Sequence, residues 1–218
     1  MMDLLKQLCA LPCVSSFEDA VRDYIKEQAT PYVDTMNVDA MGNLICFKKG
    51  AKATETKLML CAHMDEVGLM VRSITEDGYL KFVCVGGMDR RVLLGKQVLV
   101  GDRQVPGVIG LKAIHMTTAE ERKKVPKLED YYIDIGASSR EEAEALVEVG
   151  YPCVFRSDCV EFGDSCLKAK ALDDRVGCAV LLELLRRDLP MDCTFVFTVQ
   201  EEVGTRGAFG AAFSVTPD

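Results

Sequence analysis

The sequence predicts an α/β fold with a mixed sheet, interrupted by an inserted small β-barrel. Two continuous apolar runs, at 57–62 and 193–199, are typical of strands that are buried on both faces of a sheet. An amphipathic stretch at 174–187 lies between these runs along the chain and indicates a helix. After the first run, short strands alternate with turn signals such as Pro106-Gly107, which favours a small barrel or sandwich.

The remaining elements complete this two-part organisation. The first part begins with an amphipathic helix, whose apolar face carries Val21 and Ile25. Strands at 32–38 and 44–47 then flank a turn, and a further helix is predicted at 207–213. The inserted part has one helix, at 141–149. We therefore expect a discontinuous α/β domain, formed by residues 1–66 and 165–218, around a β-barrel domain formed by residues 67–164.

Composition excludes several function classes. The net charge is −8 and the pI is about 4.9, and no stripe of lysine and arginine is present, so nucleic acid and anionic membranes are not expected partners. The N-terminus lacks the pattern of a secretory signal, and no apolar run approaches the ~20 residues that span a bilayer. The ten cysteines form no C-x-x-C pair and are expected to be reduced and mostly buried. A cytoplasmic location is predicted.

Three acidic clusters, each following an apolar run, carry the candidate chemistry. In the first, His63 and Asp65 stand two residues apart and point to the same side if the strand continues. A neutral imidazole can bind a metal ion through one nitrogen while the other donates to a carboxylate that fixes the tautomer. Asp65 has the spacing for that orienting role. The alternative is a loop histidine that is satisfied by a neighbouring acid.

The other two clusters supply carboxylates only. Asp173 and Asp174 stand at the start of the helix predicted at 174–187. One carboxylate can bridge two cations, and the alternative is that one of them caps the helix. Both apply if the two adjacent acids divide these roles. Glu201 and Glu202 follow the second buried run, where adjacent acids are costly unless cations or donors lie nearby. One can bind a metal ion while the other acts as a general base. The alternative is an exposed loop.

Taken together, the clusters favour a pair of metal ions that share a bridging carboxylate and a water molecule, a common hydrolytic arrangement. Without metal ions, Asp173, Glu201 and Glu202 would repel one another. Like charge and burial should then raise the pKa of at least one of these carboxyls.

Three strings in the clusters, AHMDEVGLMV, KAKALDDRVG and QEEVGTRGA, closely resemble the tetrahedral (TET-type) dinuclear metalloaminopeptidases, also called the glutamyl aminopeptidase family. The resemblance extends over the whole chain and implies that the α/β domain is a zinc-peptidase catalytic domain. It also implies that the inserted barrel is a dimerisation domain, through which dimers assemble into a dodecamer.

The resemblance assigns a role to each acidic cluster. His63 and Glu202 each bind one metal ion, Asp173 bridges both, and Glu201 is the general base. Asp65 orients His63, Asp174 lies beside the ligands as a supporting residue, and the peptide bond between Asp173 and Asp174 is expected to be cis. The other histidine, His115, lies in the inserted domain and is expected to be structural.

The implied function is hydrolysis of N-terminal residues from peptides with a free N-terminus, with two zinc or cobalt ions as cofactors. Family members are longer and supply another aspartate and a histidine ligand from the additional part. The chain is therefore expected to be a C-terminally truncated and poorly active form, which assembles as a homo-oligomer. The alternatives are a non-catalytic fragment that folds and dimerises, or another amidohydrolase, such as a deacylase, with the same type of metal site.

Overall fold

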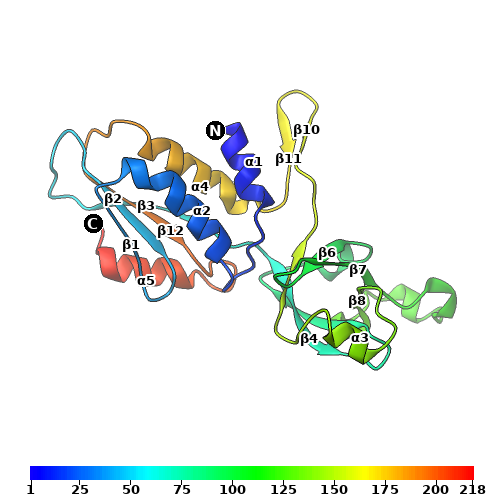
Figure 1. Ribbon diagram of the computed structural model, residues 1–218. Coiled ribbons are helices and arrows are strands. Elements are labelled where there is room, and N and C mark those ends of the chain that lie inside the picture. The colour runs from blue at the N-terminus through cyan, green and yellow to red at the C-terminus, as the bar shows by residue number, and fades with distance from the viewer. The chain divides into compact units, whose positions relative to one another are not determined.

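The computed structural model describes all residues, 1–218, and divides into two compact units (Figure 1). The first, here called the α/β unit, comprises Met1–Glu66 and Asp158–Asp218. The second, the barrel unit, comprises Val67–Ser157. The barrel unit therefore ends before residue 164, where the sequence analysis placed its boundary, and the two-stranded hairpin that follows belongs to the α/β unit.

The α/β unit contains four sheet strands and four helices, together with a two-stranded hairpin and a short 3₁₀ turn. The helices are α1 (Met2–Ala10), α2 (Asp19–Ala29), α4 (Leu172–Leu185) and α5 (Arg206–Val215), with a 3₁₀ turn at Thr30–Tyr32. The sheet strands are β1 (Thr35–Val38), β2 (Leu44–Lys48), β3 (Leu58–His63) and β12 (Cys193–Thr198), and the hairpin is formed by β10 (Val160–Phe162) and β11 (Cys166–Lys168).

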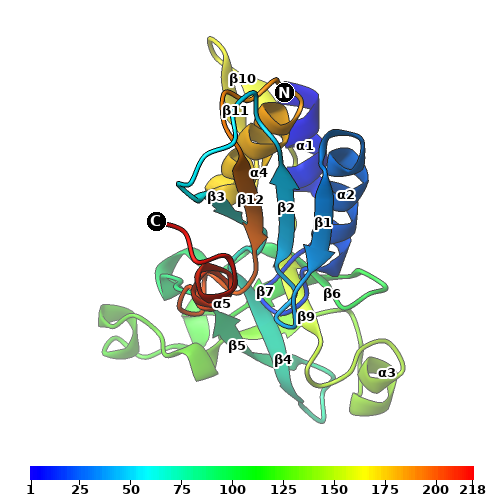
Figure 2. The same ribbon diagram turned by 90° about the vertical axis from the view of Figure 1, so that its left-hand side faces the viewer.

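The sheet of the α/β unit is mixed, which confirms the predicted fold class. Its strand order is β1-β2-β12-β3, with β12 antiparallel to β2 and parallel to β3. Helices α1, α2 and α4 cover one face of this sheet, and α5 lies on the other face (Figures 1 and 2). The parallel pair is important for the site, because it brings the carboxyl ends of two strands to the same edge of the sheet.

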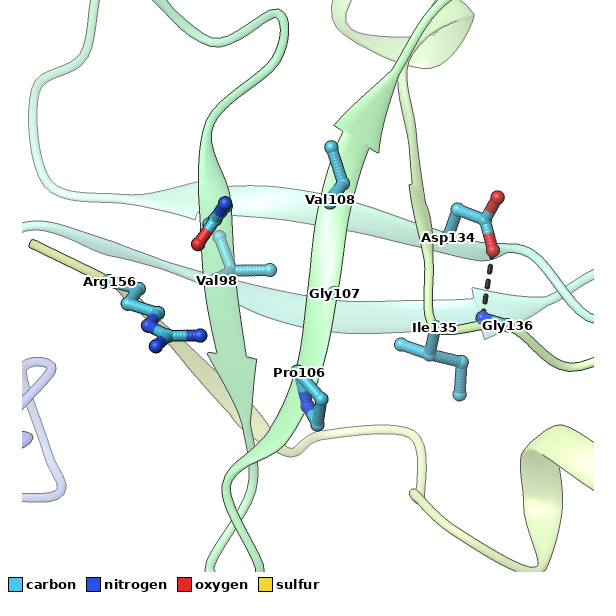
Figure 3. Close-up of a pocket in the computed structure, with 9 residues that line it drawn as sticks. Val98, Pro106, Gly107, Val108, Asp134, Ile135, Gly136 and Arg156 are labelled. Carbon is cyan, nitrogen blue, oxygen red and sulfur yellow. Dashed lines mark hydrogen bonds between the residues drawn. The ribbon is translucent and has the colours of Figure 1, made fainter.

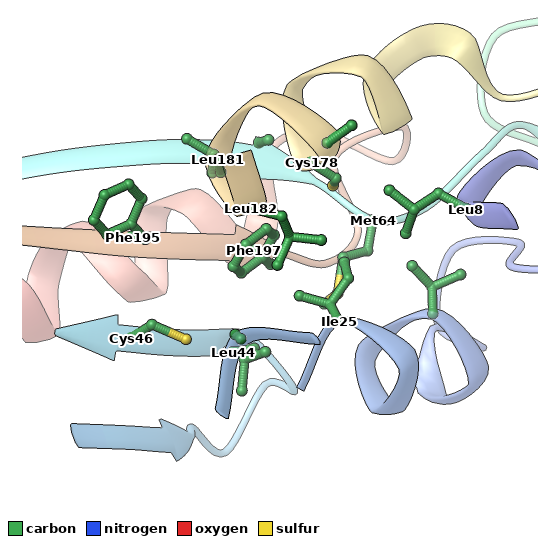
Figure 4. Close-up of a cluster of buried hydrophobic side chains, with 14 of the residues drawn as sticks. Leu8, Ile25, Leu44, Cys46, Met64, Cys178, Leu181, Leu182, Phe195 and Phe197 are labelled. Atoms are coloured by element: carbon green, nitrogen blue, oxygen red, sulfur yellow. The ribbon is translucent and has the colours of Figure 1, made fainter. Parts of the chain in front are cut away.

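A continuous hydrophobic core fills the space between the sheet and the helices that cover it. Phe195 and Phe197 of β12 are fully buried and pack with Ile25 of α2 and Leu182 of α4 (Figure 4). Burying a side chain of this size contributes roughly 1.5–3 kcal/mol. Strand β12 is thus the central, doubly covered strand that its apolar run predicts.

Two details of burial in this unit differ from the sequence-based predictions. Strand β3 is an edge strand, with Leu58 39% exposed and Cys61 exposed as well, whereas its apolar run indicated burial on both faces. In α4, the amphipathic pattern at 174–187 predicts an inward face that includes Val176 and Val180, but these two side chains are 43% and 41% exposed. They lie beside the stripe that α4 turns toward the sheet, so the chain covers them only in part.

The barrel unit is a closed antiparallel barrel, as predicted, with the strand order β4-β5-β8-β7-β6-β9. Its strands are β4 (Gly68–Ile74), β5 (Leu80–Val85), β6 (Gln97–Val100), β7 (Val105–Gly110), β8 (Tyr132–Asp134) and β9 (Pro152–Phe155). Helix α3 (Arg140–Glu144) is shorter than predicted, and 3₁₀ turns lie at Arg90–Val92, Ile114–Met116, Glu121–Lys123 and Leu128–Asp130. Closure leaves no free edge on this barrel.

A shallow depression of about 410 Å³ opens on the barrel between β6, β7 and the segment after β8 (Figure 3). Its lining includes Val98, Gly107 and Ile135, with Asp134 and Arg156 as its charged groups. None of the candidate site residues lines it. No helix in the structure is long and apolar enough to cross a membrane.

The burial of the cysteines gives a direct test of the fold. Cys46 and Cys153 are fully buried, and burial raises the pKa of each thiol to about 12. Cys61 and Cys166 are exposed. At pH 8 we expect iodoacetamide to label the exposed pair first, because the thiolate is the reactive form. Peptide mass spectrometry after timed labelling measures this order. Equal labelling of Cys46 and Cys61 in the folded protein would contradict the placement of β2 inside the sheet.

Candidate functional site

The site lies at the carboxyl edge of the parallel pair β3 and β12. In the strand register, Thr198 of β12 lies beside His63, the last residue of β3. The chain that follows β12 therefore passes directly by the imidazole of His63. This local geometry brings the first and third acidic clusters together, although they are separated by more than a hundred residues of sequence.

The imidazole of His63 is largely buried, and its two nitrogens have different surroundings. Nδ1 lies 3.0 Å from the backbone oxygen of Asp65 and 3.5 Å from its carboxylate oxygen Oδ1. Nε2 lies 3.0 Å from Oδ1 of Asp173 and 3.9 Å from Oε2 of Glu201. Hydrogen bonding at Nδ1 leaves Nε2 directed at the acids, which is the arrangement that a metal-binding histidine uses.

Glu201 and Glu202 complete a compact group with this imidazole. One ligand atom from each of His63, Glu201 and Glu202 lies within 4.8 Å of the others. Both glutamates are partly exposed, so their carboxylates remain accessible from the solvent. The predicted convergence of the first and third clusters is therefore present in the structure.

The carboxylate of Asp65 lies behind the imidazole and is fully buried. It accepts hydrogen bonds from the hydroxyl of Ser15 at 2.6 Å and from the backbone N–H groups of Glu201 at 3.0 Å and Glu202 at 3.1 Å. Burial opposes the charged form, but these bonds and the contact with His63 outweigh it and hold the pKa of Asp65 below its usual value.

The two acids of the second cluster, Asp173 and Asp174, have different contacts. The peptide bond between Asp173 and Asp174 is cis, as the resemblance led us to expect. The side chain of Asp173 is 90% exposed and points to the imidazole of His63. Asp174 accepts a hydrogen bond from the N–H of Gly177 at 2.8 Å, and so caps the regular part of α4. The capping alternative thus applies to Asp174, and Asp173 joins the acid group.

The electrostatics reflect this crowding of acids around one imidazole. Burial disfavours the charged imidazole, but Asp65, Asp173 and Glu201 outweigh burial and raise the pKa of His63 to about 9. Burial, followed by the charges of neighbouring acids, raises the pKa of Glu202. The prediction that at least one carboxyl would have a raised pKa is therefore confirmed. A cation can relieve the same repulsion, and it would have to displace the proton from His63.

The donor set fits a divalent metal ion. One imidazole nitrogen and several carboxylate oxygens are ligands that zinc and related ions accept. His115, by contrast, is exposed on a 3₁₀ turn of the barrel unit, among none of these acids.

Sequence reasoning missed two buried polar residues that contact this site from the N-terminal loop. They are Ser15, which binds the carboxylate of Asp65, and Glu18, which accepts a hydrogen bond from the N–H of Gln200 at 3.0 Å. The two residues stand at the S-x-x-E spacing of a capping box. That pattern predicts the start of a helix and does not indicate a contact with a distant site.

The structure therefore combines an α/β unit, with an imidazole and acids at the carboxyl edge of its sheet, and a closed barrel unit inserted into its chain. A protein-family model matches this chain over most of its length. Residues 42–218 match the model of the M42 glutamyl aminopeptidases, and the chain belongs to that family.

Individual relatives agree with the family assignment. The chain is 40% identical to a TET aminopeptidase from a marine-sediment Thaumarchaeota archaeon, with a TM-score of 0.94 over 100% of this chain and 64% of that one. It is 36% identical to the TET1 peptidase of Pyrococcus horikoshii, which can assemble into a tetrahedron or a large octahedral shell, with a TM-score of 0.89 over 100% of this chain and 66% of that one.

A lysyl aminopeptidase of Pyrococcus furiosus is 32% identical over 99% of this chain and 64% of its own length. The chain spans between 57% and 64% of the length of the first curated relatives that it matches.

Proposed function

We propose that the protein is a metal-dependent aminopeptidase, which hydrolyses the N-terminal residue from peptides at the carboxyl edge of β3 and β12. The observation that carries this proposal is the convergence of His63 with Glu201 and Glu202, whose ligand atoms lie within 4.8 Å of one another. Asp173, which is 3.0 Å from the same imidazole nitrogen, supplies the further carboxylate that a second ion would need.

In this proposal, His63 and Glu202 would each hold one of two divalent ions, and Asp173 would be a ligand that both ions share. Zinc and cobalt both suit this mixture of nitrogen and oxygen ligands. When bound, such a pair supplies Lewis-acid chemistry, which polarises a peptide carbonyl and makes water more acidic. The resemblance implies that a further aspartate and a histidine complete the ligand set from the part of the relatives that this chain does not match.

The residues of this chain then perform the proton transfers. Glu201 accepts a proton from the attacking water and passes it to the leaving amine nitrogen. Its side chain is 37% exposed, so it can reach both water and substrate. Asp65 and its backbone oxygen keep Nδ1 of His63 engaged, which leaves Nε2 free to bind the metal ion.

We also propose that the protein forms a homo-oligomer through the barrel unit. Support comes from the peptidase of Pyrococcus horikoshii, which assembles into closed shells. Apolar side chains such as Val92 and Leu94, 58% and 56% exposed, lie on the barrel unit of this chain. Exposed apolar groups of this kind are common at protein interfaces.

A matched pair of amino-acid anilides tests the proposed function, because removal of the N-terminal residue then releases the aniline directly. One substrate has a free amine and the other is the same amino-acid anilide with an acetylated amine. We expect the 218-residue chain, supplied with zinc or cobalt, to release aniline slowly and only from the free-amine substrate. A chelator should abolish this release.

Each other outcome contradicts a part of the proposal. Release of acetate from the acetylated substrate would indicate a deacylase. No cleavage of either substrate, even at high protein concentration, would indicate that the 218-residue chain is a non-catalytic fragment. Cleavage that survives chelation would argue against a metal-dependent reaction.

A further inference from the structure

Two buried carboxylates, those of Asp65 and Glu18, bind the backbone that carries the acid pair, Glu201 and Glu202. Asp65 accepts hydrogen bonds from the N–H groups of Glu201 and Glu202, as described above. The carboxylate of Glu18 accepts one from the N–H of Gln200. Three consecutive backbone N–H groups, at 200–202, therefore all donate hydrogen bonds to buried carboxylates. Hydrogen bonds to charged groups are stronger than those between neutral groups.

Both of these carboxylates are fixed by the N-terminal loop between α1 and α2. Ser15, which is 2% exposed, donates its hydroxyl to Oδ2 of Asp65 at 2.6 Å. Glu18, which is 5% exposed, is itself a member of the loop, and its Oε1 also accepts the N–H of Ser16 at 2.8 Å. The loop thus reaches the acid pair by two separate routes.

The segment at 200–202 needs such support because its backbone is unusual. Gln200 has a φ of 54°, in the left-handed region that non-glycine residues rarely adopt. Residues held in such conformations persist only where the surroundings over-determine them. The direction of the backbone at this point decides where the partly exposed side chains of Glu201 and Glu202 point.

We propose that Ser15 and Glu18 are positioning residues, which set the geometry of the Glu201–Glu202 pair through Asp65 and through the N–H of Gln200. This inference rests on the proposed function, in which the pair supplies a metal ligand and the general base. Neither residue touches the reacting atoms. Their effect is to pre-organise the two carboxylates before metal ions and substrate arrive.

The loop remains attached to the domain when the hydroxyl of Ser15 is removed. The N–H of Cys13 donates to the carboxylate of Glu66 at 3.1 Å, and the N–H of Glu66 donates to the carbonyl oxygen of Cys13 at 2.9 Å. These two bonds do not involve Ser15. A Ser15→Ala variant should therefore fold, and its effect should be confined to the carboxylate of Asp65 and the amides bound to it.

Amide hydrogen exchange of the metal-free chain tests the positioning role without any reference to catalysis. In Ser15→Ala we expect the amides of Glu201 and Glu202 to exchange about tenfold faster, because Asp65 loses its fixed orientation. Ser16→Ala is the matched control, since Ser16 is an exposed neighbour in the same loop. It should leave these amides unchanged. Unaltered exchange in Ser15→Ala would overturn the inference for Ser15.

Glu18 provides an independent variant. Glu18→Ala should accelerate exchange at the amide of Gln200, whereas Glu18→Gln keeps an acceptor oxygen and should restore most of the protection. Equal exchange in both variants and in the unmodified chain would overturn the inference for Glu18.

Co²⁺ binding tests whether Ser15 also affects the affinity of the proposed metal site. Residues that orient metal ligands typically change metal affinity 10–100-fold, so Ser15→Ala should weaken Co²⁺ binding about tenfold and alter its visible absorption spectrum. Ser15→Thr, which retains the hydroxyl, should restore both. A purely structural role would instead lower the melting temperature without changing the spectrum of the bound ion.

Amide exchange and Co²⁺ binding together distinguish a failure of the positioning role from a failure of the proposed metal site. If the unmodified chain binds no Co²⁺ while Ser15→Ala still accelerates exchange, the proposed metal site is wrong and the positioning role stands. If Co²⁺ binds equally well to the unmodified chain and to Ser15→Ala, and exchange is also unchanged, the positioning role is wrong and the metal site stands.

Discussion

Replacing Glu201 by glutamine is expected to lower kcat for the proposed peptide hydrolysis by about 10²–10⁴-fold, while the metal content stays unchanged. Glutamine has nearly the same shape as glutamate, but its amide cannot accept the proton of the attacking water. The carboxylate of Glu201 lies 3.9 Å from Nε2 of His63 and belongs to the same compact group as Glu202. Steady-state kinetics combined with elemental analysis of the purified variant measure both quantities.

The neighbouring residue provides the contrast that makes this test specific. Glu202→Gln should lower the affinity of the site for a metal ion or abolish binding, because a neutral amide is a much poorer ligand than a carboxylate. Glu27→Gln, on the exposed side of α2, is the control for loss of one negative charge and should behave as the unmodified enzyme. If Glu201→Gln lost its metal while Glu202→Gln kept it, the two roles would have to be exchanged.

The convergence of these residues could be predicted from the sequence because it depends on simple rules. His63 and Glu201 each follow an apolar run, and two such runs in an α/β domain are expected to form parallel neighbours. Parallel strands direct their carboxyl ends to the same edge, so the two clusters had to meet if β3 and β12 were paired. The register between His63 and Thr198 shows that they are.

The division of labour between Asp173 and Asp174 could be anticipated only as a pair of alternatives. Adjacent acids before a helix can cap it or face a site, and the sequence does not say which does which. The structure decides this through one hydrogen bond, from the N–H of Gly177 to Asp174. The side chain of Asp173 is then left to approach His63.

Other features were beyond the reach of sequence patterns because they depend on long-range neighbours. An apolar run indicates a buried strand, but it does not show whether a partner strand lies on both sides, and β3 turned out to have only one. Ser15 and Glu18 carry no periodic signal, since their importance comes from Asp65 and Gln200, which lie far away in the sequence. Contacts of this kind become visible only when the chain is folded.

The most unusual buried side chain in the α/β unit is Arg175, which directly follows the second acidic cluster and is fully buried. Its Nε donates to the carbonyl oxygen of Met64 at 2.9 Å, and Nη1 donates to the carbonyl oxygen of Leu8. Its third nitrogen lies 3.9 Å from the carboxylate of Glu66, which also pairs with Lys170 at 2.6 Å. One guanidinium thus connects the end of α1, the segment after β3 and the start of α4.

Replacing Arg175 by alanine is expected to lower the free energy of unfolding by about 3–5 kcal/mol, the range for breaking a buried charged pair by removing one partner. The variant would remove one hydrogen-bond donor from each of two carbonyl oxygens, those of Met64 and Leu8, and leave a cavity beside Met64, the residue between His63 and Asp65. Arg186→Ala, at the end of the same helix, removes an exposed guanidinium that pairs with Glu183 at 3.0 Å, and should cost about 0–1 kcal/mol. Urea unfolding of the two variants measures the difference. Similar losses in both would mean that Arg175 is not fixed in the interior, and that the backbone carrying the first acidic cluster is held in place by the sheet alone.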